Sequence, residues 1–223
     1  MQAWHSSSDG GRRAAGATLQ PRRREACAYL AGSGLPVWPL CGWAGLRPLQ
    51  RGRREFGELA LGAARLGPQQ RVGYLNDGVN QRVERCPDDP DHDHWATPYE
   101  TLTRGAGDCE DSAIAKFFLL LASGAPDGGV RLLYAWQLVG EPPFRRRAHM
   151  VVVVRRISED PWVLDSARLM AEPLSLRDDL VPVFSFDERR LWYRLDAEPL
   201  PPARSRLRPW QELLERWHAQ CAH

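Results

Sequence analysis

The sequence predicts an α+β fold, in which a mainly helical half is followed by a half made of antiparallel strands. Between residues 55 and 124, apolar residues recur about every three to four positions, which is the period of an α-helix. After residue 129 the apolar residues instead form short runs separated by turn residues, as is typical of strands. No internal repeat is visible, and 223 residues are enough for one domain with a substantial core.

The first part of the chain, residues 1–54, differs from the rest. Its early segment SSSDGGRRAAGATLQPRRR has no apolar period and is typical of disorder. The apolar segment that follows is interrupted by Gly and Pro, and the basic residues before it are far from Met1, so no clear secretion signal is present. We therefore predict a disordered or atypical extension over 1–54, with a degraded signal or an over-extended start as alternatives, and one domain over 55–223.

Four helices are expected from the apolar periods. Two short ones, beginning near Phe56 and spanning 72–86, precede a loop at 87–94 and a connector at 95–107. The strongest helix begins at Asp108 and is ended by Gly124, and a terminal amphipathic helix covers 209–220. The strands are expected at 130–139, 149–157, 161–166, 181–186 and 191–195, the last two as a hairpin.

Composition excludes several classes of function. The net charge is only +2 and the central region has no dense basic block, which argues against nucleic acid as a partner. No stretch is long and apolar enough to span a membrane. Five cysteines are present and none lies in a C-x-x-C pair, so a structural zinc site or a dithiol redox motif is not expected.

The segment GDCEDSAIAKFF (107–118) places Cys109 among three carboxylates at a helix start. Asp108 suits the N-cap position, and Asp111 stands three residues later, as in a capping box. Free backbone N–H groups and the helix dipole favour a thiolate in the first turn, whereas Asp108, Glu110 and Asp111 oppose its ionisation. The alternative is that the acids only cap the helix and that Cys109 is an ordinary small residue.

Two later residues complete a possible catalytic set. His149 begins a strand of four valines, and Asp165 ends the next apolar strand. The short connection predicts an antiparallel pair, and pairing 149 with 165 would centre the turn near residue 157, so the two side chains are expected to meet. Cys109, His149 and Asp165 would then be nucleophile, base and orienting residue. Alternatively, the histidine and the aspartate are ordinary polar residues.

Four segments carry a resemblance to a known family: HWATPYETLTRGAGDCEDSAIAKFFLL, AHMVVVV, WVLDS and RDDLVPVFSFDERRLWY. They resemble the bacterial transglutaminase-like cysteine proteinases of the LapG type, over roughly residues 72–195. The resemblance implies a papain-like or transglutaminase-like core with the catalytic helix packed on an antiparallel sheet. It also implies a Cys109–His149–Asp165 triad and a Ca²⁺ ion bound through Asp108, Glu110 and possibly Asp111. Such an ion would neutralise the acids that flank the thiol.

The function implied by this resemblance is that of a calcium-dependent cysteine endopeptidase. It would cleave an extended segment of a large cell-surface adhesin, and so control surface attachment and biofilm formation. The resemblance further implies a periplasmic location and an inner-membrane cyclic-dinucleotide receptor that sequesters the protease. A transglutaminase or amidase on the same core, and an inactive binding module, are the alternatives. Ser166 stands where the family often has Asn, and PDDPDHDH replaces a stretch that usually contains aromatic residues and glycine.

Three further segments are weaker candidates. His92, Asp93 and His94 could bind a divalent metal, although a solvated acidic loop is the commoner reading of such a segment. Trp95 is expected either to line a substrate cleft or oxyanion site or to lie in the core. Phe144 and the arginines 145–147 could form the rim of a cleft or simply be a solvated charge run.

Overall fold

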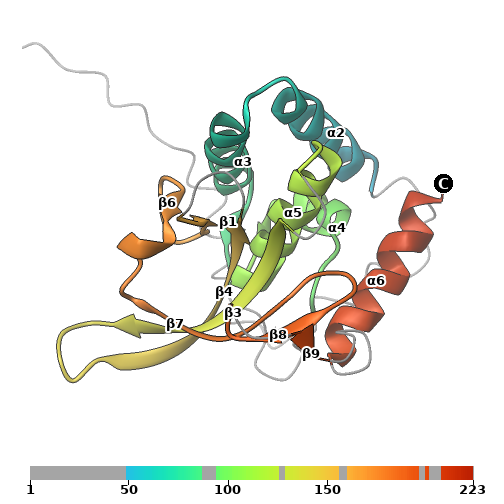
Figure 1. Cartoon of the computed structure of the whole chain (residues 1–223). Coiled ribbons are helices and arrows are strands. Elements are labelled where there is room, and N and C mark those ends of the chain that lie inside the picture. Colours follow the sequence, from blue (N-terminus) through green and yellow to red (C-terminus); the bar gives the residue numbers. More distant parts are fainter. Residues whose placement is uncertain are drawn as a thin grey trace, which may run out of the picture. The chain divides into compact units, whose positions relative to one another are not determined.

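The computed structural model describes residues 49–86, 94–125, 129–155, 160–195, 199–200 and 207–222. In this part of the chain, helices pack against a seven-stranded sheet in which every neighbouring pair is antiparallel (Figure 1). The predicted α+β fold is therefore confirmed. The extension expected over 1–54 lies outside the described residues up to residue 48, and the first described helix already begins at Gln50.

The described helices are α2 (Gln50–Ala64), α3 (Pro68–Arg82), α4 (Pro98–Arg104), α5 (Cys109–Ala122), the short 3₁₀ helix η1 (Leu174–Leu176) and α6 (Arg208–Cys221). The strands of the main sheet are β3 (Val130–Val139), β4 (Arg145–Val154), β5 (Trp162–Leu164), β6 (Glu172–Pro173), β7 (Leu180–Phe186), β8 (Leu191–Tyr193) and β9 (Pro199–Leu200), in the order β6-β5-β4-β3-β7-β8-β9. None of these helices has the length and hydropathy needed to cross a membrane.

Helix α5 is the centre of the core. It packs against β3 and β4 and against α2, α3 and α4 (Figure 1). Its residues from 111 to 120 are all buried, which fits a helix that is apolar on nearly every side. Asp108 caps its start by accepting a hydrogen bond of 2.9 Å from the Asp111 N–H, and Gly124, at a φ of 87°, follows its last turn. The predicted cap and stop signals are both confirmed.

From His149 to Val154, the strand β4 is buried on both faces. Met150, Val152 and Val154 belong to the large core cluster that includes α5, whereas Val151 and Val153 belong to a smaller cluster on the other face. This burial explains the uninterrupted valine run, because a strand covered on both sides needs apolar residues at every position. The strand that carries His149 is thus held rigidly within the sheet.

The terminal helix α6 closes one end of the core. Trp210 is completely buried, and its ring stacks against Phe118 of α5 with 5.9 Å between the centroids. Trp217 packs against the same phenylalanine at 4.8 Å. The predicted amphipathic helix at 209–220 is therefore confirmed, and its apolar face covers α5.

The prediction of a connector without regular structure at 95–107 is wrong, because this segment contains helix α4. Thr97 and Glu100 form a reciprocal capping box: the Thr97 Oγ1 accepts the Glu100 N–H at 3.3 Å, and Glu100 accepts the Thr97 N–H at 2.9 Å. Pro98 occupies the first helical turn, where its missing N–H costs nothing. The segment is rich in turn residues, and for this reason the start of the helix was not predicted.

Other boundaries also differ from the prediction. Helix α3 runs over 68–82 instead of 72–86, because Glu84–Arg85 (β1) pairs with Ala106–Gly107 (β2) in a short parallel ladder. Strand β4 begins at Arg145 instead of His149, since the long antiparallel pairing with β3 extends to the 139–145 turn. Leu61, expected on the apolar face of α2, is 66% exposed.

Candidate active site

Cys109 is the first residue of α5 and is only partly exposed. The backbone N–H of Met150 on β4 hydrogen-bonds to the thiol, which acts to lower its pKa. This contact places the start of the helix against the strand position next to His149. The helix cap and the strand together fix where the sulfur lies.

The expected meeting of His149 and Asp165 is confirmed. The His149 Nε2 lies 2.8 Å from the Asp165 Oδ1, and both side chains are completely buried. Val152 pairs with Leu164, so the register differs by two residues from a direct pairing of 149 with 165, and the two side chains meet diagonally. Burial acts to raise the pKa of Asp165, but the hydrogen bond and the charge of His149 hold it well below its usual value.

The other imidazole nitrogen has a different environment. Among the described residues, the buried Nδ1 of His149 has no hydrogen-bond partner. Because an ionised carboxylate accepts the proton on Nε2, the neutral ring carries that proton on Nε2 and leaves Nδ1 as an acceptor. His149 is therefore prepared to receive a proton from a neighbouring group.

The thiol of Cys109 is not bonded to His149. It donates to the Glu110 Oε2 at 2.7 Å, and no hydrogen bond joins it to the imidazole within the described chain. Burial, followed by the charge of Glu110 and this hydrogen bond, raises the pKa of the Cys109 thiol. The structure thus brings two members of the expected triad together and leaves the third held in its protonated form by the adjacent carboxylate.

Asp108 and Glu110 form a closely spaced acidic pair. Burial raises the pKa of Asp108 to about 9, and the charges of Asp111 and Glu110 add to this effect. Because the neighbouring acidic groups oppose ionisation of Asp108, a hard divalent cation, which prefers oxygen donors, would be suited to this pair. Among the residues described, no group of three or more His, Cys, Asp or Glu side chains is arranged to hold a metal, so further ligands would have to be carbonyls or water.

Asp111 faces a different set of partners. Its Oδ1 accepts the backbone N–H of Ala96 at 2.7 Å, and its Oδ2 lies 3.6 Å from the Arg104 guanidinium. The side chain is completely buried. These contacts tie the segment before α4, and the last residue of α4, to the first turn of α5. Asp111 thereby holds the local structure, while Asp108 and Glu110 remain beside the thiol.

Sequence reasoning missed several polar residues around Asp165. The Asn76 Oδ1 accepts the Asp165 N–H at 3.0 Å and also the Lys116 ammonium at 2.9 Å. Asn80, one turn further along α3, donates to the Asp165 carbonyl at 3.0 Å. Arg177 donates to the Asp165 carboxylate at 2.7 Å. The signals were Asn76 and Asn80 beside the apolar face of α3 and the chain's single lysine within the apolar run of α5.

Lys116 should make stability depend on pH. Burial lowers its pKa to about 7, from an ordinary value of 10.5. Between these two values the unfolded state binds more protons than the folded state, so the free energy of unfolding should rise with pH, by up to about 1.4 kcal/mol per pH unit. Urea denaturation from pH 6 to 9.5 should show this rise in the wild type and a flatter profile in Lys116→Met. Parallel profiles would contradict the assignment.

The structure gives a different outcome for each of the weaker candidates. His92 and Asp93 lie outside the described residues, and the His94 Nε2 is 3.6 Å from the Glu100 carboxylate. Trp95 is 7% exposed and stacks on Phe186, so it belongs to the core. A shallow pocket next to it is lined by His94, Trp95, Arg208, Pro209, Glu212 and Arg216. This lining includes none of the three residues of the expected triad.

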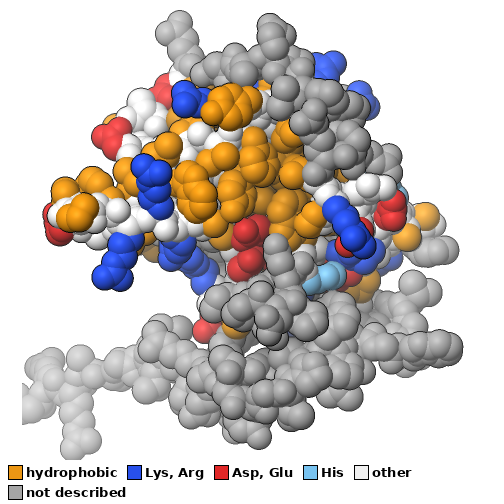
Figure 2. All heavy atoms as spheres, turned by 90° about the horizontal axis from the view of Figure 1, so that it is seen from below, with side chains coloured by type: hydrophobic (Ala, Val, Ile, Leu, Met, Phe, Trp, Pro, Cys, Tyr) orange, Lys and Arg blue, Asp and Glu red, His pale blue; other side chains and the backbone are white. Residues whose placement is uncertain are grey.

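The surface near the strands is partly apolar. Trp136 on β3, Val181 on β7 and Phe144 in the β3–β4 turn are exposed by 38%, 43% and 51%. Figure 2, which views the domain from below relative to Figure 1, shows hydrophobic side chains gathered on one face with carboxylates beside them and arginines towards the margins. The arginines 145–147 are also exposed, but the structure does not assign them to a cleft.

Comparison with solved structures places this geometry in a family. The structure of Legionella pneumophila LapG after EGTA treatment is 31% identical in sequence, with a TM-score of 0.64, over 74% of this chain and 89% of that one. The chain belongs to the LapG family. The family resemblance and the papain-like or transglutaminase-like core expected from the sequence are therefore confirmed.

A second LapG structure extends the match. Calcium-bound Legionella pneumophila LapG is 29% identical, with a TM-score of 0.61, over 86% of this chain and 98% of that one. The same LapG has thus been solved both with calcium and after treatment with a calcium chelator. No protein-family model matches the chain, and no curated protein sequence matches it.

Proposed function

We propose that this protein is a calcium-dependent cysteine endopeptidase that cleaves an extended segment of a large cell-surface adhesin. The observation that carries the proposal is the buried His149–Asp165 pair. The His149 Nδ1 has no hydrogen-bond partner within the described part of the chain, and Met150, the next residue of the same strand, contacts the Cys109 thiol. Membership of the LapG family supports the same reaction. The exposed apolar face in Figure 2 is suited to an extended polypeptide with apolar side chains.

The first half of the proposed reaction forms an acyl-enzyme. The Cys109 thiol leaves Glu110 and gives its proton to the His149 Nδ1, and the sulfur attacks the carbonyl carbon of the substrate peptide bond. Asp165 holds the imidazolium through Nε2 and stabilises its charge. The C–N bond then breaks, and the proton on Nδ1 passes to the leaving amine. The substrate acyl group is left on Cys109 as a thioester.

The second half releases the product. Water attacks the thioester carbonyl while the His149 Nδ1 accepts one of its protons. The C–S bond breaks, and the proton returns from the imidazole to the sulfur. The products are a carboxylic acid, which gives its proton to the solvent, and a free thiol, so the enzyme regains its starting state. An amine in place of water would give transamidation, which is the alternative reaction on this core.

The proposed role of calcium concerns the acids beside the thiol. Asp108 and Glu110 would hold the ion, with carbonyl and water oxygens completing its shell. A bound ion would neutralise carboxylates that otherwise oppose ionisation of Cys109. The Glu110 Oε2, which accepts the hydrogen bond from the thiol, would then bind the ion instead. The thiol would be released to form a hydrogen bond with His149.

Location and regulation remain proposals drawn from the family resemblance alone. We propose that the protein is periplasmic, where it could reach the part of a surface adhesin that lies in the periplasm. An inner-membrane cyclic-dinucleotide receptor would sequester it. Cell fractionation and co-purification with such a receptor would test these two proposals independently of the chemistry.

The chemistry is tested by analysing the products formed from an extended adhesin segment. The purified protein, with calcium, is incubated with the segment in heavy-oxygen water and in the presence of a primary amine. Hydrolysis should give a cleaved chain whose new carboxylate carries one heavy oxygen. Incorporation of the amine would instead indicate a transglutaminase. Absence of both products, with no thioester on Cys109, would overturn the proposal and indicate a binding module.

A further inference from the structure

Asp165 is shared between two buried cationic or proton-donating groups. Its Oδ1 is 2.8 Å from the His149 Nε2 and also accepts the Ala167 N–H at 2.8 Å. Its Oδ2 accepts a hydrogen bond of 2.7 Å from the Arg177 Nη2. The side chains of Asp165 and Arg177 are both completely buried. Each carboxylate oxygen therefore has its own partner, and the plane of the group is fixed.

Arg177 is in turn held by a second carboxylate. Its Nε and Nη2 donate to the two oxygens of Asp179, at 2.8 and 3.0 Å. Although burial acts to raise the pKa of Asp179, the bonds from Arg177 and Gln137 lower it to about 2, so this partner is ionised at every working pH. The paired geometry is one that a planar guanidinium provides and a lysine does not.

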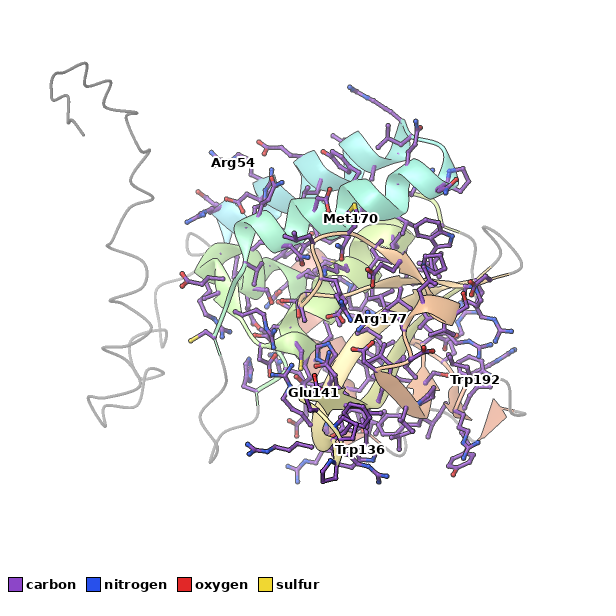
Figure 3. The ribbon with its side chains drawn as sticks, turned by 90° about the vertical axis from the view of Figure 1, so that its left-hand side faces the viewer. Arg54, Trp136, Glu141, Met170, Arg177 and Trp192 are labelled. Carbon is purple, nitrogen blue, oxygen red and sulfur yellow. The ribbon has the colours of Figure 1, made fainter. Side chains whose placement is uncertain are left out.

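The network continues to the strands of the sheet. The Gln137 amide on β3 donates to Asp179 at 2.9 Å and accepts from Arg147 on β4 at 2.6 Å. Arg168 and Glu172 also face this network, at 3.6 Å from Asp179 and 3.8 Å from Arg177. Figure 3 places Arg177 in the interior, between the loop that carries Met170 and the hairpin that carries Trp136 and Glu141. The guanidinium is thus anchored to elements outside the Asp165 loop.

The physical consequence concerns the orientation of the imidazole. Three hydrogen bonds from outside the loop fix Asp165: Asn76 and Asn80 of α3 bind its backbone, and Arg177 binds its carboxylate. Burying the Asp165 carboxylate without a cation would cost free energy. The side chain would then rotate away or take up a proton. With Arg177 in place, Asp165 stays an acceptor for Nε2, and the Nδ1 of His149 keeps its lone pair, with no partner among the residues that the structure describes.

We propose that Arg177 is a positioning residue of this active site, which holds Asp165 in the orientation that directs His149 towards Cys109. This inference rests on the function proposed above. Arg177 acts through Asp165 and does not touch the reacting atoms. Its anchorage on Asp179 makes the network from β3 to Asp165 part of the catalytic arrangement.

The test compares Arg177→Met, Arg177→Lys and a matched surface control, Arg54→Met. Arg54 is largely exposed and its Nε lies 3.8 Å from Glu58, so its loss should leave the site unchanged (Figure 3). The readouts are kcat and KM on the adhesin segment, and the low-field proton resonance of the His149 Nε2–H in the calcium-loaded protein. For Arg177→Met we expect kcat to fall by about 100-fold, KM to change little, and the resonance to shift or disappear.

Each outcome has one interpretation. If Arg177→Met is folded, with wild-type kcat and resonance, the inference is overturned. If Arg177→Met does not fold, Arg177→Lys decides: a lower kcat at unchanged KM supports the inference, and a wild-type kcat overturns it. If the wild type itself does not cleave, the proposed function fails, and the resonance alone then reports whether Arg177 holds the His149–Asp165 pair.

Discussion

Replacing Cys109 by alanine should abolish proteolysis while the domain stays folded. Loss of the nucleophile removes the group proposed to form the thioester, so the activity should fall by about 10⁴-fold or more. Cys109 is a small, partly exposed first-turn residue, whose thiol hydrogen-bonds to the Glu110 carboxylate and to the backbone N–H of Met150. Its removal should therefore change the free energy of unfolding by less than about 1 kcal/mol. Cleavage rates and urea denaturation of the purified variant measure the two effects separately.

The matched control for this prediction is Cys221→Ala. Cys221 is an exposed free cysteine at the end of α6, and it lies outside the set of residues proposed for catalysis. The control should keep wild-type activity. Proteolysis by Cys109→Ala at a rate near that of the wild type would show that another residue is the nucleophile.

Removal of calcium should lower both the melting temperature and the activity of the wild type. At free calcium of about 100 times Kd, binding stabilises a protein by about 2.7 kcal/mol. For a domain of this size, that stabilisation corresponds to a melting temperature roughly 5–10 °C higher. Magnesium should substitute poorly, because it demands a tighter octahedral shell and keeps its water. Differential scanning fluorimetry with a chelator, followed by addition of each ion, measures the effect.

Three variants separate the metal site from the helix cap. Asp108→Asn and Glu110→Gln keep side chains of similar shape, so they should fold but lose the response of the melting temperature to calcium. Asp111→Asn should lower stability with or without calcium, since its carboxylate binds the Ala96 N–H and faces Arg104. If a chelator changes neither the melting temperature nor the activity of the wild type, the calcium proposal is contradicted. The acidic residues would then serve only to cap the helix.

Local patterns made most of the fold predictable from the sequence. The period of α5 and its cap residues Asp108 and Gly124 are local signals, and the valine run of β4 marks a strand buried on both faces. Helix α4 was missed because segment 95–107 is rich in turn residues, although Thr97 and Glu100 form a capping box and Pro98 lies in the first helical turn. The parallel β1–β2 pair was missed because each strand has two residues and depends on distant pairing.

The candidate site could be predicted only in part, for the same reason. His149 and Asp165 lie on neighbouring strands joined by a short connection, so their approach follows from local topology. Arg177 and Asn76 reach Asp165 from sequence separations of 12 and 89 residues, which no periodicity indicates. The bond from Cys109 to Glu110 depends on rotamers within a crowded acidic turn, which residue spacing does not determine.

The measurement that tests the central claim most directly is site-resolved labelling of the cysteines with a thiol-reactive probe. The calcium-loaded protein is treated with iodoacetamide near pH 6, and the adducts are located by peptide mass spectrometry. If His149 activates Cys109, Cys109 should be alkylated much faster than Cys86 and Cys221, and His149→Ala should remove this advantage. Equal, slow labelling of Cys86, Cys109 and Cys221, unchanged in His149→Ala, would contradict the proposed cysteine protease mechanism.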